Sequence, residues 1–488
     1  MTGEVTGHVT DTPATRRPAT STPPHTAEHE PEHEPDGRPR RVLVVGGGCV
    51  GLYTAHRLQR TLRRELRRGR AEIVLVSPDP YMTYQPFLPE AAAGSLSPRH
   101  VVVPLRRVLH RCRVLAGEAV SADPAARTVR VRTPAVAEEG GEPLELSYDE
   151  LVLAPGSVSR TLPVPGLADH GIGFKTVEEA IGLRNHVLSQ LDIASSTRDA
   201  HLRDAALTFV FVGGGYAGTE ALAELEDMAR HACRYYHNIR PAEQKWILVE
   251  AGDRILPELG ERMGRYALRE LRARNIDVRL GTRLESCTGG VARLSDGTRY
   301  PTRTLVWTTG VRPHPVLAAC DVPLDDRGRV RCTPGLRVTG RPHVWAAGDA
   351  AAVPDLTAPR PPDGAHAEMC APTAQHAVRQ ARRLADNITA TLRDRPESDY
   401  RYASAGSVAS LGLHKGVARV RGKRLKGYPA WLLHRVYHLA RVPTLNRKSR
   451  VLAEWTLAGL FKREIVSLGS LEHPRAEFEI AAGARRAP

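Results

Sequence analysis

The feature that most constrains this chain is a glycine-rich strand, loop and helix pattern that occurs twice. The mainly apolar residues 41–45 are followed by Gly46-x-Gly48-x-x-Gly51, a helix-like stretch and a second mainly apolar run at 72–77. This order predicts a βαβ unit with parallel strands. The same order returns from residue 207, with Gly213-x-Gly215-x-x-Gly218 as its loop. Two such units predict an α/β protein with two related domains.

The glycine spacing predicts that each loop binds a dinucleotide. The first glycine makes the tight turn, the second lets the backbone reach a pyrophosphate, and the third lets the helix pack on the strand. In the second unit Glu250 ends the strand, where a carboxylate would accept hydrogen bonds from ribose and repel a 2′-phosphate, which favours NADH. Glu250 lies farther from its glycines than the usual ~20 residues, so we expect residues 226–245 to loop out. The equivalent position in the first unit is Ser77.

Three other glycines complete the pattern. An apolar strand at 344–347 ends in Gly348 and Asp349, which suit a phosphate or a ribityl chain, and Gly156 and Gly310 follow strands at the predicted crossings between domains. With the paired loops, these segments resemble the flavoproteins that bind FAD on the first unit and NAD(P)H on the second. This resemblance implies two Rossmann-like dinucleotide-binding domains (FAD and NADH), the second inserted in the first. We expect the strands at 100–105, 127–133 and 149–156 to form a mixed sheet.

The domain boundaries follow from the shifts in composition. We expect a disordered tail at 1–38, a FAD-binding domain at 39–205 and 313–400, an NADH-binding domain at 206–312, and a basic C-terminal membrane-association or dimer segment at 401–488.

Five motifs narrow the resemblance. They are Tyr81-x-x-Tyr84-x-Pro86, Gly173-Phe174-Lys175-Thr176-x-Glu178, Gly218-Thr219-Glu220, Ala374-Gln375-x-Ala377-x-x-Gln380 and Gly427-x-x-Ala430-Trp431-Leu432. Over about residues 40–470 the chain resembles the type II NADH dehydrogenases, the single-subunit NADH:quinone oxidoreductases.

The resemblance implies a ping-pong reaction without proton pumping, in which NADH reduces FAD and the flavin then reduces a quinone. We expect menaquinone as the acceptor. It also implies that Glu220 lies where nicotinamide meets flavin, that Lys175 lies near the flavin edge, and that Gln375 or Gln380 faces the flavin or the quinone, with Ala374 in the quinone-site sequence. Taken singly, these residues have simpler interpretations: first-turn helix stabilisation for Glu220, a surface charge for Lys175, and helix surface for both glutamines.

The cysteines help to weigh other functions. The seven cysteines are an odd number and the nearest two, Cys320 and Cys332, are twelve positions apart, which argues against a disulfide framework and against a C-x-x-C metal or redox motif. We predict no metal site and a reducing compartment. Cys332 and Cys370 leave open a sulfide:quinone reductase-like enzyme, whereas Cys49 is more simply a small buried residue. A non-catalytic NADH-sensing flavin-fold protein is a further alternative, because Ser77 and Pro155 replace an expected acid and threonine.

The net charge of +15 is concentrated near the end of the chain. Residues 401–488 hold 17 basic and five acidic side chains, and no motif for nucleic-acid binding accompanies them, so we expect no nucleic-acid partner. We expect instead peripheral binding of an anionic membrane surface on the cytoplasmic face, and release from membranes when 401–488 is deleted. No stretch of 18 uncharged apolar residues predicts a membrane span.

Residues 428–441 are predicted to form an amphipathic helix in this segment. Winding it as a helix places His434, His438 and Arg441 on one stripe, and Trp431, Leu432, Val436 and Leu439 on an apolar face. Such a helix suits a membrane interface, and on periodicity alone it suits docking on the core or on the partner in a homodimer equally well.

Overall fold

The computed structural model describes residues 38–359, 368–404, 406–461, 463, 465 and 466. The chain divides into two units, 1–38 and 39–488, and the fold below is that of the second unit. The expected disordered tail lies outside the described residues except for Arg38.

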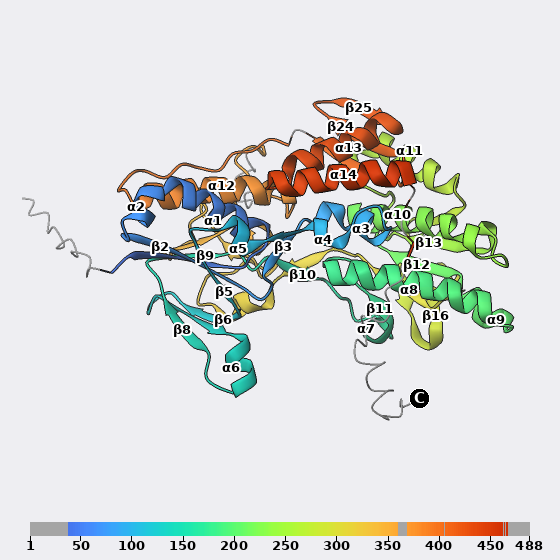
Figure 1. Cartoon of the computed structure of the whole chain (residues 1–488), viewed down its shortest axis with the longest axis horizontal. Coiled ribbons are helices and arrows are strands. Elements are labelled where there is room, and N and C mark those ends of the chain that lie inside the picture. Colours follow the sequence, from blue (N-terminus) through green and yellow to red (C-terminus); the bar gives the residue numbers. More distant parts are fainter. Residues whose placement is uncertain (1–37, 360–367, 405, 462, 464, 467–488) are drawn as a thin grey trace, which may run out of the picture. The chain divides into compact units, whose positions relative to one another are not determined.

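The first glycine loop belongs to a five-stranded parallel sheet (Figure 1). Its strands, in spatial order, are β21 (Val344–Ala346), β9 (Glu150–Leu153), β1 (Arg40–Val45), β2 (Ala71–Ser77) and β5 (Arg113–Ala116). Val42, Leu43 and Val44 are fully buried, as expected for a central parallel strand covered on both faces. Because β21 pairs with β9 across some 190 residues, the second glycine unit is inserted in the first.

The second glycine loop belongs to another five-stranded parallel sheet. Its order is β11 (Gly171–Ile172), β18 (Thr304–Trp307), β12 (Thr208–Val212), β13 (Lys245–Val249) and β14 (Ile276–Arg279). The expectation that 226–245 loops out is wrong for its first part. Residues 226–232 extend helix α10 (Tyr216–Ala232), because Met228, Ala229 and Ala232 are buried on its inner face, and two 3₁₀ turns, η2 (Cys233–Tyr235) and η3 (Pro241–Glu243), follow.

Helices flank both sheets. Those of the FAD-type unit are α1 (Cys49–Thr61), α2 (Arg63–Arg67), α5 (Leu105–Val108) and α12 (Ala374–Thr391). Those of the NADH-type unit are α8 (Val177–Ser196), α9 (Ala200–Ala206), α10 and α11 (Glu261–Arg272), and α3 (Leu88–Ala92) and α4 (Pro98–Val101) pack into the same core. Helices α1 and α12 lie side by side (Figure 1), and Thr54 Oγ1 donates to the Ala381 carbonyl at 3.3 Å. The last helix of the FAD-type unit therefore covers its first.

The expected mixed sheet is wrong. Residues 100–105, 127–133 and 149–156 contribute β4 (Val102–Pro104), β7 (Thr128–Arg132) and β9, which belong to three different sheets. Strand β9 is buried throughout and apolar except for Glu150, so it enters the parallel sheet. Strand β7 alternates between buried and less buried residues and pairs antiparallel with β6 (Glu118–Asp123) and β8 (Leu144–Ser147).

Short strands and turns complete the unit. They are β3 (Tyr81–Thr83), β10 (Ser157–Ser159), β15 (Leu284–Ser286), β16 (Val291–Leu294), β17 (Arg299–Pro301), β19 (Val311–Pro313), β20 (Val330–Arg331) and β22 (Ala351–Ala352), with α6 (Pro134–Glu139), α7 (Leu167–His170), η1 (Gln85–Phe87), η4 (Pro257–Leu259), η5 (Thr288–Gly290), η6 (Pro315–Ala319) and η7 (Gly348–Ala350). Strands β10 and β19 pair antiparallel where the chain crosses between the two domains.

The C-terminal segment forms a three-stranded sheet and two helices. These are β23 (Gly406–Ser410), β24 (Gly416–Val420), β25 (Lys423–Lys426), α13 (Tyr428–Arg441) and α14 (Leu445–Phe461). None of the helices in the described residues is both long and apolar enough to cross a bilayer.

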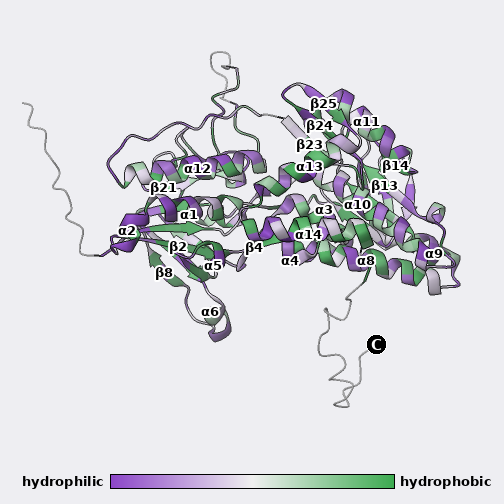
Figure 2. Cartoon of the chain, turned by 45° about the horizontal axis from the view of Figure 1, so that its top comes forward, coloured by the Kyte–Doolittle hydropathy of each residue, from purple (hydrophilic) through white to green (hydrophobic). Residues whose placement is uncertain are grey.

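Helix α13 has the expected bounds, but its predicted apolar face is divided between buried and exposed residues. Trp431, His434 and Arg435 point inward, whereas Leu432 and Val436 are 46% and 56% exposed. The polar stripe is drawn inward by buried carboxylates beneath it, described below. Figure 2 shows hydrophobic turns on both α13 and α14.

The tight packing of the first glycine loop predicts unequal effects of alanine substitutions. A Cβ on Gly51 would lie 1.8 Å from the Gly46 carbonyl oxygen, whereas a Cβ on Gly48 would meet nothing within 4 Å. We expect Gly51→Ala to destabilise the protein by about 1–3 kcal/mol, as overpacking does. Gly48→Ala, the matched control, should unfold in urea close to the wild-type midpoint, and equal losses in both variants would contradict this packing.

Candidate active site

The first glycine loop leaves room for an anion at a helix N-terminus. Gly46 has φ +104°, and a Cβ there would lie 2.1 Å from the Ala154 carbonyl oxygen. Gly48 caps α1 without any side-chain acceptor. A cavity of about 230 Å³ is lined by the loop together with Ser77 and Asp79. Free backbone N–H groups beside an open cavity suit the pyrophosphate of FAD.

The second loop repeats this geometry. Gly213 has φ +114°, a Cβ on Gly218 would lie 2.0 Å from the Gly213 carbonyl oxygen, and Gly215 caps α10 with open space around it. Glu250 follows β13 and accepts from the backbone N–H groups of Gly214 and Gly252, each at 2.6 Å. The structure therefore brings the predicted acid to the predicted loop, an arrangement that fits NADH.

Lys175 and Asp349 are joined through a residue that sequence reasoning missed. Lys175 Nζ donates to Ser157 Oγ at 2.6 Å, and the Ser157 hydroxyl donates to Asp349 Oδ2 at 2.6 Å. Burial lowers the pKa of Lys175, although Asp349 and Glu179 act in the opposite direction. Lys175 is therefore not an ordinary surface charge. The only sequence signal for Ser157 is its place directly after Gly156 at the domain crossing.

The two glutamines of α12 have different neighbours. Gln380 is buried, and its Oε1 accepts from the Gly348 N–H at 2.7 Å, so it positions the Gly348–Asp349 turn. Gln375 donates from Nε2 to the Gly406 carbonyl at 2.9 Å and accepts from the Tyr402 hydroxyl at 2.8 Å. The helix-surface interpretation is wrong for Gln380. Ala374 is the exposed first residue of the helix.

Glu220 lies under the C-terminal segment. Its Oε1 accepts from the Ser410 N–H at 2.7 Å and pairs with His434 Nε2 at 3.2 Å, and both side chains are at least 90% buried. The alternative of first-turn helix stabilisation is wrong, because the first turn of α10 holds no acid.

Two more buried carboxylates pair with the same segment. Glu90 contacts Arg435 Nη2 at 3.4 Å and accepts from Trp455 Nε1 at 2.6 Å. Glu224 contacts Arg463 Nη2 at 3.1 Å; burial raises the pKa of Glu224 although Arg463 opposes this. Sequence reasoning missed both acids, because each cation lies more than 200 residues away along the chain.

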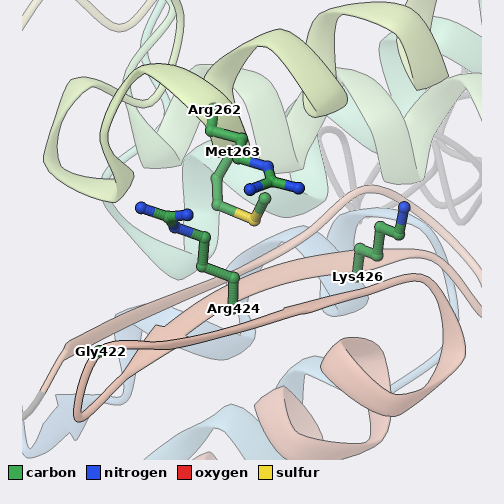
Figure 3. A pocket seen from close by; sticks show the side chains of 5 residues that line it. All are labelled: Arg262, Met263, Gly422, Arg424 and Lys426. Atoms are coloured by element: carbon green, nitrogen blue, oxygen red, sulfur yellow. The ribbon is translucent and has the colours of Figure 1, made fainter.

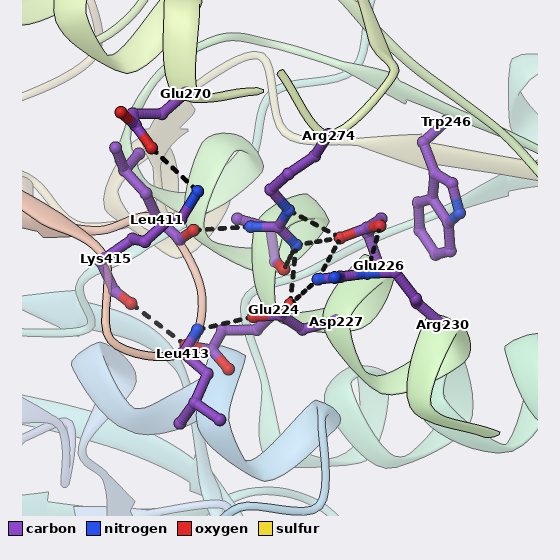
Figure 4. Close-up of polar contacts among 12 residues, drawn as sticks. Glu224, Glu226, Asp227, Arg230, Trp246, Glu270, Arg274, Leu411, Leu413 and Lys415 are labelled. Carbon is purple, nitrogen blue, oxygen red and sulfur yellow. Dashed lines mark hydrogen bonds and ion pairs between the residues drawn. The ribbon is translucent and has the colours of Figure 1, made fainter. Parts of the chain in front are cut away.

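A loop of the same segment is held by a charged cluster on α10, on α11 and just after α11 (Figure 4). Arg274 pairs with Glu226 and donates to the Leu411 carbonyl at 2.7 Å, and the Leu413 N–H donates to Asp227 Oδ2 at 2.6 Å. Lys415 Nζ lies 2.9 Å from Glu270. The C-terminal segment is thus tied to the NADH-type unit through both backbone and side chains.

Two histidines of α13 titrate in opposite directions. Burial acts to lower the pKa of His434, but the hydrogen bond to Glu220 and the charges of Glu220, Glu90 and Glu224 outweigh it and raise that pKa. The His438 ring centroid lies 4.5 Å from that of His434. Burial, His434 and Arg441 hold the pKa of His438 well below its usual value. The buried His434 ring therefore lies in the field of three acidic side chains that raise its pKa.

The cysteines do not support sulfide chemistry. All seven are free. Burial raises the pKa of Cys332 and of Cys49 to about 12, and that of Cys370 to about 11. Their thiols stay protonated, whereas a reactive cysteine needs a lowered pKa.

Comparison with known proteins agrees with this geometry. Residues 32–381 match the family model of the pyridine nucleotide-disulphide oxidoreductases. The type II NADH:quinone oxidoreductase Ndh of Mycobacterium tuberculosis is 28% identical over 441 residues, covering 87% of this chain and 89% of that protein. The type II NADH:quinone oxidoreductase of Staphylococcus aureus is 28% identical over 403 residues, covering 81% and 94%. The structure of NDH2 from Plasmodium falciparum in complex with NADH has a TM-score of 0.79 at 17% identity, covering 88% of this chain and 100% of that one.

The fold and the paired loops define a two-dinucleotide oxidoreductase. The chain belongs to the pyridine nucleotide-disulphide oxidoreductase family. The resemblance to the type II NADH dehydrogenases is confirmed by the relatives, and family and fold support the expected cofactors, FAD and NADH.

The raised pKa of His434 predicts a pH-dependent contribution to stability. A histidine whose pKa is raised on folding stabilises the folded protein fully at pH values below its pKa in the unfolded chain, near 6.5. This stabilisation is lost as the pH rises through the pKa of the folded state. At pH 6, His434→Gln should cost about 3 kcal/mol, because Glu220 loses its buried partner. The difference from wild type in urea unfolding should shrink at pH 9. The exposed His201→Gln is the control, and a pH-independent cost for His434→Gln would show that the pair is not ionic.

Proposed function

We propose that this chain is a FAD-dependent NADH:quinone oxidoreductase that works by a ping-pong mechanism without proton pumping, with menaquinone as its acceptor. One observation carries the proposal. The Gly348–Asp349 turn is held from both sides, by Gln380 and by Ser157 with Lys175, beside the first glycine loop. The chain also has a second nucleotide loop, and its relatives are named as NADH:quinone oxidoreductases. A Gly348–Asp349 turn that side chains fix on two sides therefore favours a catalytic flavoenzyme over a non-catalytic sensor of NADH.

Separate sets of residues are proposed to bind FAD and NADH. For FAD we propose Gly46, Gly48, Gly51, Ser77, Gly156, Gly348 and Asp349, and for NADH, Gly213, Gly215, Gly218, Glu250 and Gly310. Ala374, the first residue of the helix that carries Gln375 and Gln380, is a further proposed cofactor-binding residue. Bound by these residues, FAD would supply the redox chemistry, as acceptor of a hydride from NADH and donor of two electrons to the quinone.

The proposed catalytic residues act by charge and position. Lys175 brings a cation, held by Ser157, next to Asp349. Gln380 fixes the backbone at Gly348, and Gln375 fastens the chain at Gly406. Glu220, paired with His434, keeps a carboxylate two residues beyond the last glycine of the NADH loop.

The absorbance spectrum of the purified protein tests this function. We expect a flavin band that bleaches on addition of NADH under anaerobic conditions and recovers on addition of a water-soluble menaquinone analogue. A protein without flavin, or a reduced band that the quinone leaves unchanged, would contradict the proposal. Sulfide in place of NADH should leave the band unbleached.

Glu250 predicts the preference for NADH. Glu250→Gln keeps the size of the side chain and removes the charge that would repel a 2′-phosphate. We expect the ratio of kcat/KM for NADPH to that for NADH to rise about tenfold, which corresponds to about 1.4 kcal/mol. Asp253→Gln, which removes a nearby exposed charge paired with Arg254, should leave the ratio within about threefold.

We also propose that the C-terminal helices bring the enzyme to the cytoplasmic face of the membrane as a peripheral protein. The inward rotation of α13 leaves Leu432 and Val436 exposed, and Leu452, Leu457 and Leu460 of α14 are exposed as well. Deletion of 401–488 does not test this, because it would leave Glu90, Glu220 and Glu224 buried without their partners.

A further inference from the structure

The hairpin of β24 and β25 carries cations that have no carboxylate partner. Its two-residue turn, Arg421 and Gly422, has φ +48° and +79°, the conformation of a tight hairpin. With Lys423, Arg424 and Lys426, the turn and β25 carry four cations and no acid. Among the described residues none of the four forms an ion pair, whereas Lys415, Arg435 and Arg463 of the same segment are all paired.

This hairpin and α11 line an open cavity of about 280 Å³ (Figure 3). Its lining residues are Arg262, Met263, Gly422, Arg424 and Lys426. Three of the five are cations, contributed by two elements far apart in the sequence, and no lining residue is acidic. Like charges held together repel, so the cavity favours an anion as its occupant.

Two acids of α11 are engaged elsewhere. Glu261 accepts from Arg265 Nη1 at 2.6 Å, and Glu270 pairs with Lys415 at 2.9 Å. Within the part of the chain that the structure describes, Arg262 and Arg424 make no hydrogen bond or ion pair through their guanidinium groups, and Lys426 Nζ lies 5.4 Å from the Tyr266 ring centroid. Two guanidinium groups with unused donors match the oxygens of a phosphate. The space beside Gly422 is open, since a Cβ there would meet nothing within 4 Å, and its φ of +79° favours glycine.

The surroundings of the cavity decide the source of the phosphate. The chain runs from β25 directly into α13, whose Tyr428, Leu432 and Val436 are exposed. A free phosphate would use only the cations, whereas a phospholipid presents a phosphate and apolar chains together. We propose that the cavity between α11 and the β24–β25 turn binds the headgroup phosphate of an anionic phospholipid. This inference rests on the proposed function, because a quinone substrate is dissolved in the membrane.

A matched pair of double variants of the full-length protein tests the site. Arg262→Gln with Arg424→Gln removes two lining cations, and Arg269→Gln with Lys423→Gln removes two exposed cations of the same helix and hairpin that do not line the cavity. Binding is measured by flotation with phosphatidylcholine vesicles, with and without phosphatidylglycerol. We expect the first pair to weaken binding to phosphatidylglycerol vesicles at least roughly tenfold and the second pair less than roughly threefold.

Each remaining outcome decides against the site. Equal losses in the two double variants would show diffuse surface charge and overturn the proposal. Inorganic phosphate that binds as tightly as monomeric short-chain phosphatidylglycerol would point to free phosphate instead. Duplex DNA that binds the wild type and is lost by the first pair would point to a nucleic acid.

Turnover with NADH and a water-soluble quinone, measured without vesicles, separates this proposal from the proposed function. If that turnover is absent, the proposed function fails while vesicle binding still reports on the cavity. If turnover is normal and vesicle binding does not depend on Arg262 and Arg424, the lipid-site proposal is overturned and the proposed function stands.

Discussion

Three buried carboxylates, Glu90, Glu220 and Glu224, are the constraint on which the arrangement of the molecule depends. A carboxylate removed from water is costly unless a cation or several hydrogen bonds compensate it. Here every compensating cation, Arg435, His434 and Arg463, comes from the C-terminal segment. The two nucleotide-binding units therefore depend on that segment for their own stability, and it is not a removable anchor.

The same pairing explains the orientation of α13. Its polar residues face the carboxylates, so its apolar residues Leu432 and Val436 face away from the core. Because Glu220 and Glu224 lie on α10, which begins at the glycine loop for NADH, the nucleotide site and the exposed apolar surface share one helix as their common support. The basic charge of the segment is likewise divided between inward cations that pair with buried acids and outward cations on the β24–β25 hairpin.

Local patterns in the sequence predicted much of the candidate site. Apolar runs followed by glycines at the spacing of Gly46, Gly48 and Gly51 specify a strand, turn and helix through short-range sterics, and both copies fold as expected. The bounds of α13 were also predictable, from the helical periodicity of the apolar and polar residues at 428–441. Three features could not be predicted from the sequence: the hydrogen bonds of Ser157 to Lys175 and Asp349, the extension of α10 to Ala232, and the place of β9 in the parallel sheet. Each depends on burial or contact with residues that are distant in the chain.

The sequence by itself determined the class of protein, since two glycine loops and their flanking strands require only local backbone geometry and a nucleotide to bind. It also determined that excess positive charge gathers near the C-terminus. Only the tertiary structure decided which of those cations are neutralised inside the molecule and which face of α13 remains exposed. The physical reason is that the cost of a buried carboxylate exists only after folding has removed water from Glu90, Glu220 and Glu224, and no periodicity in the sequence records that burial.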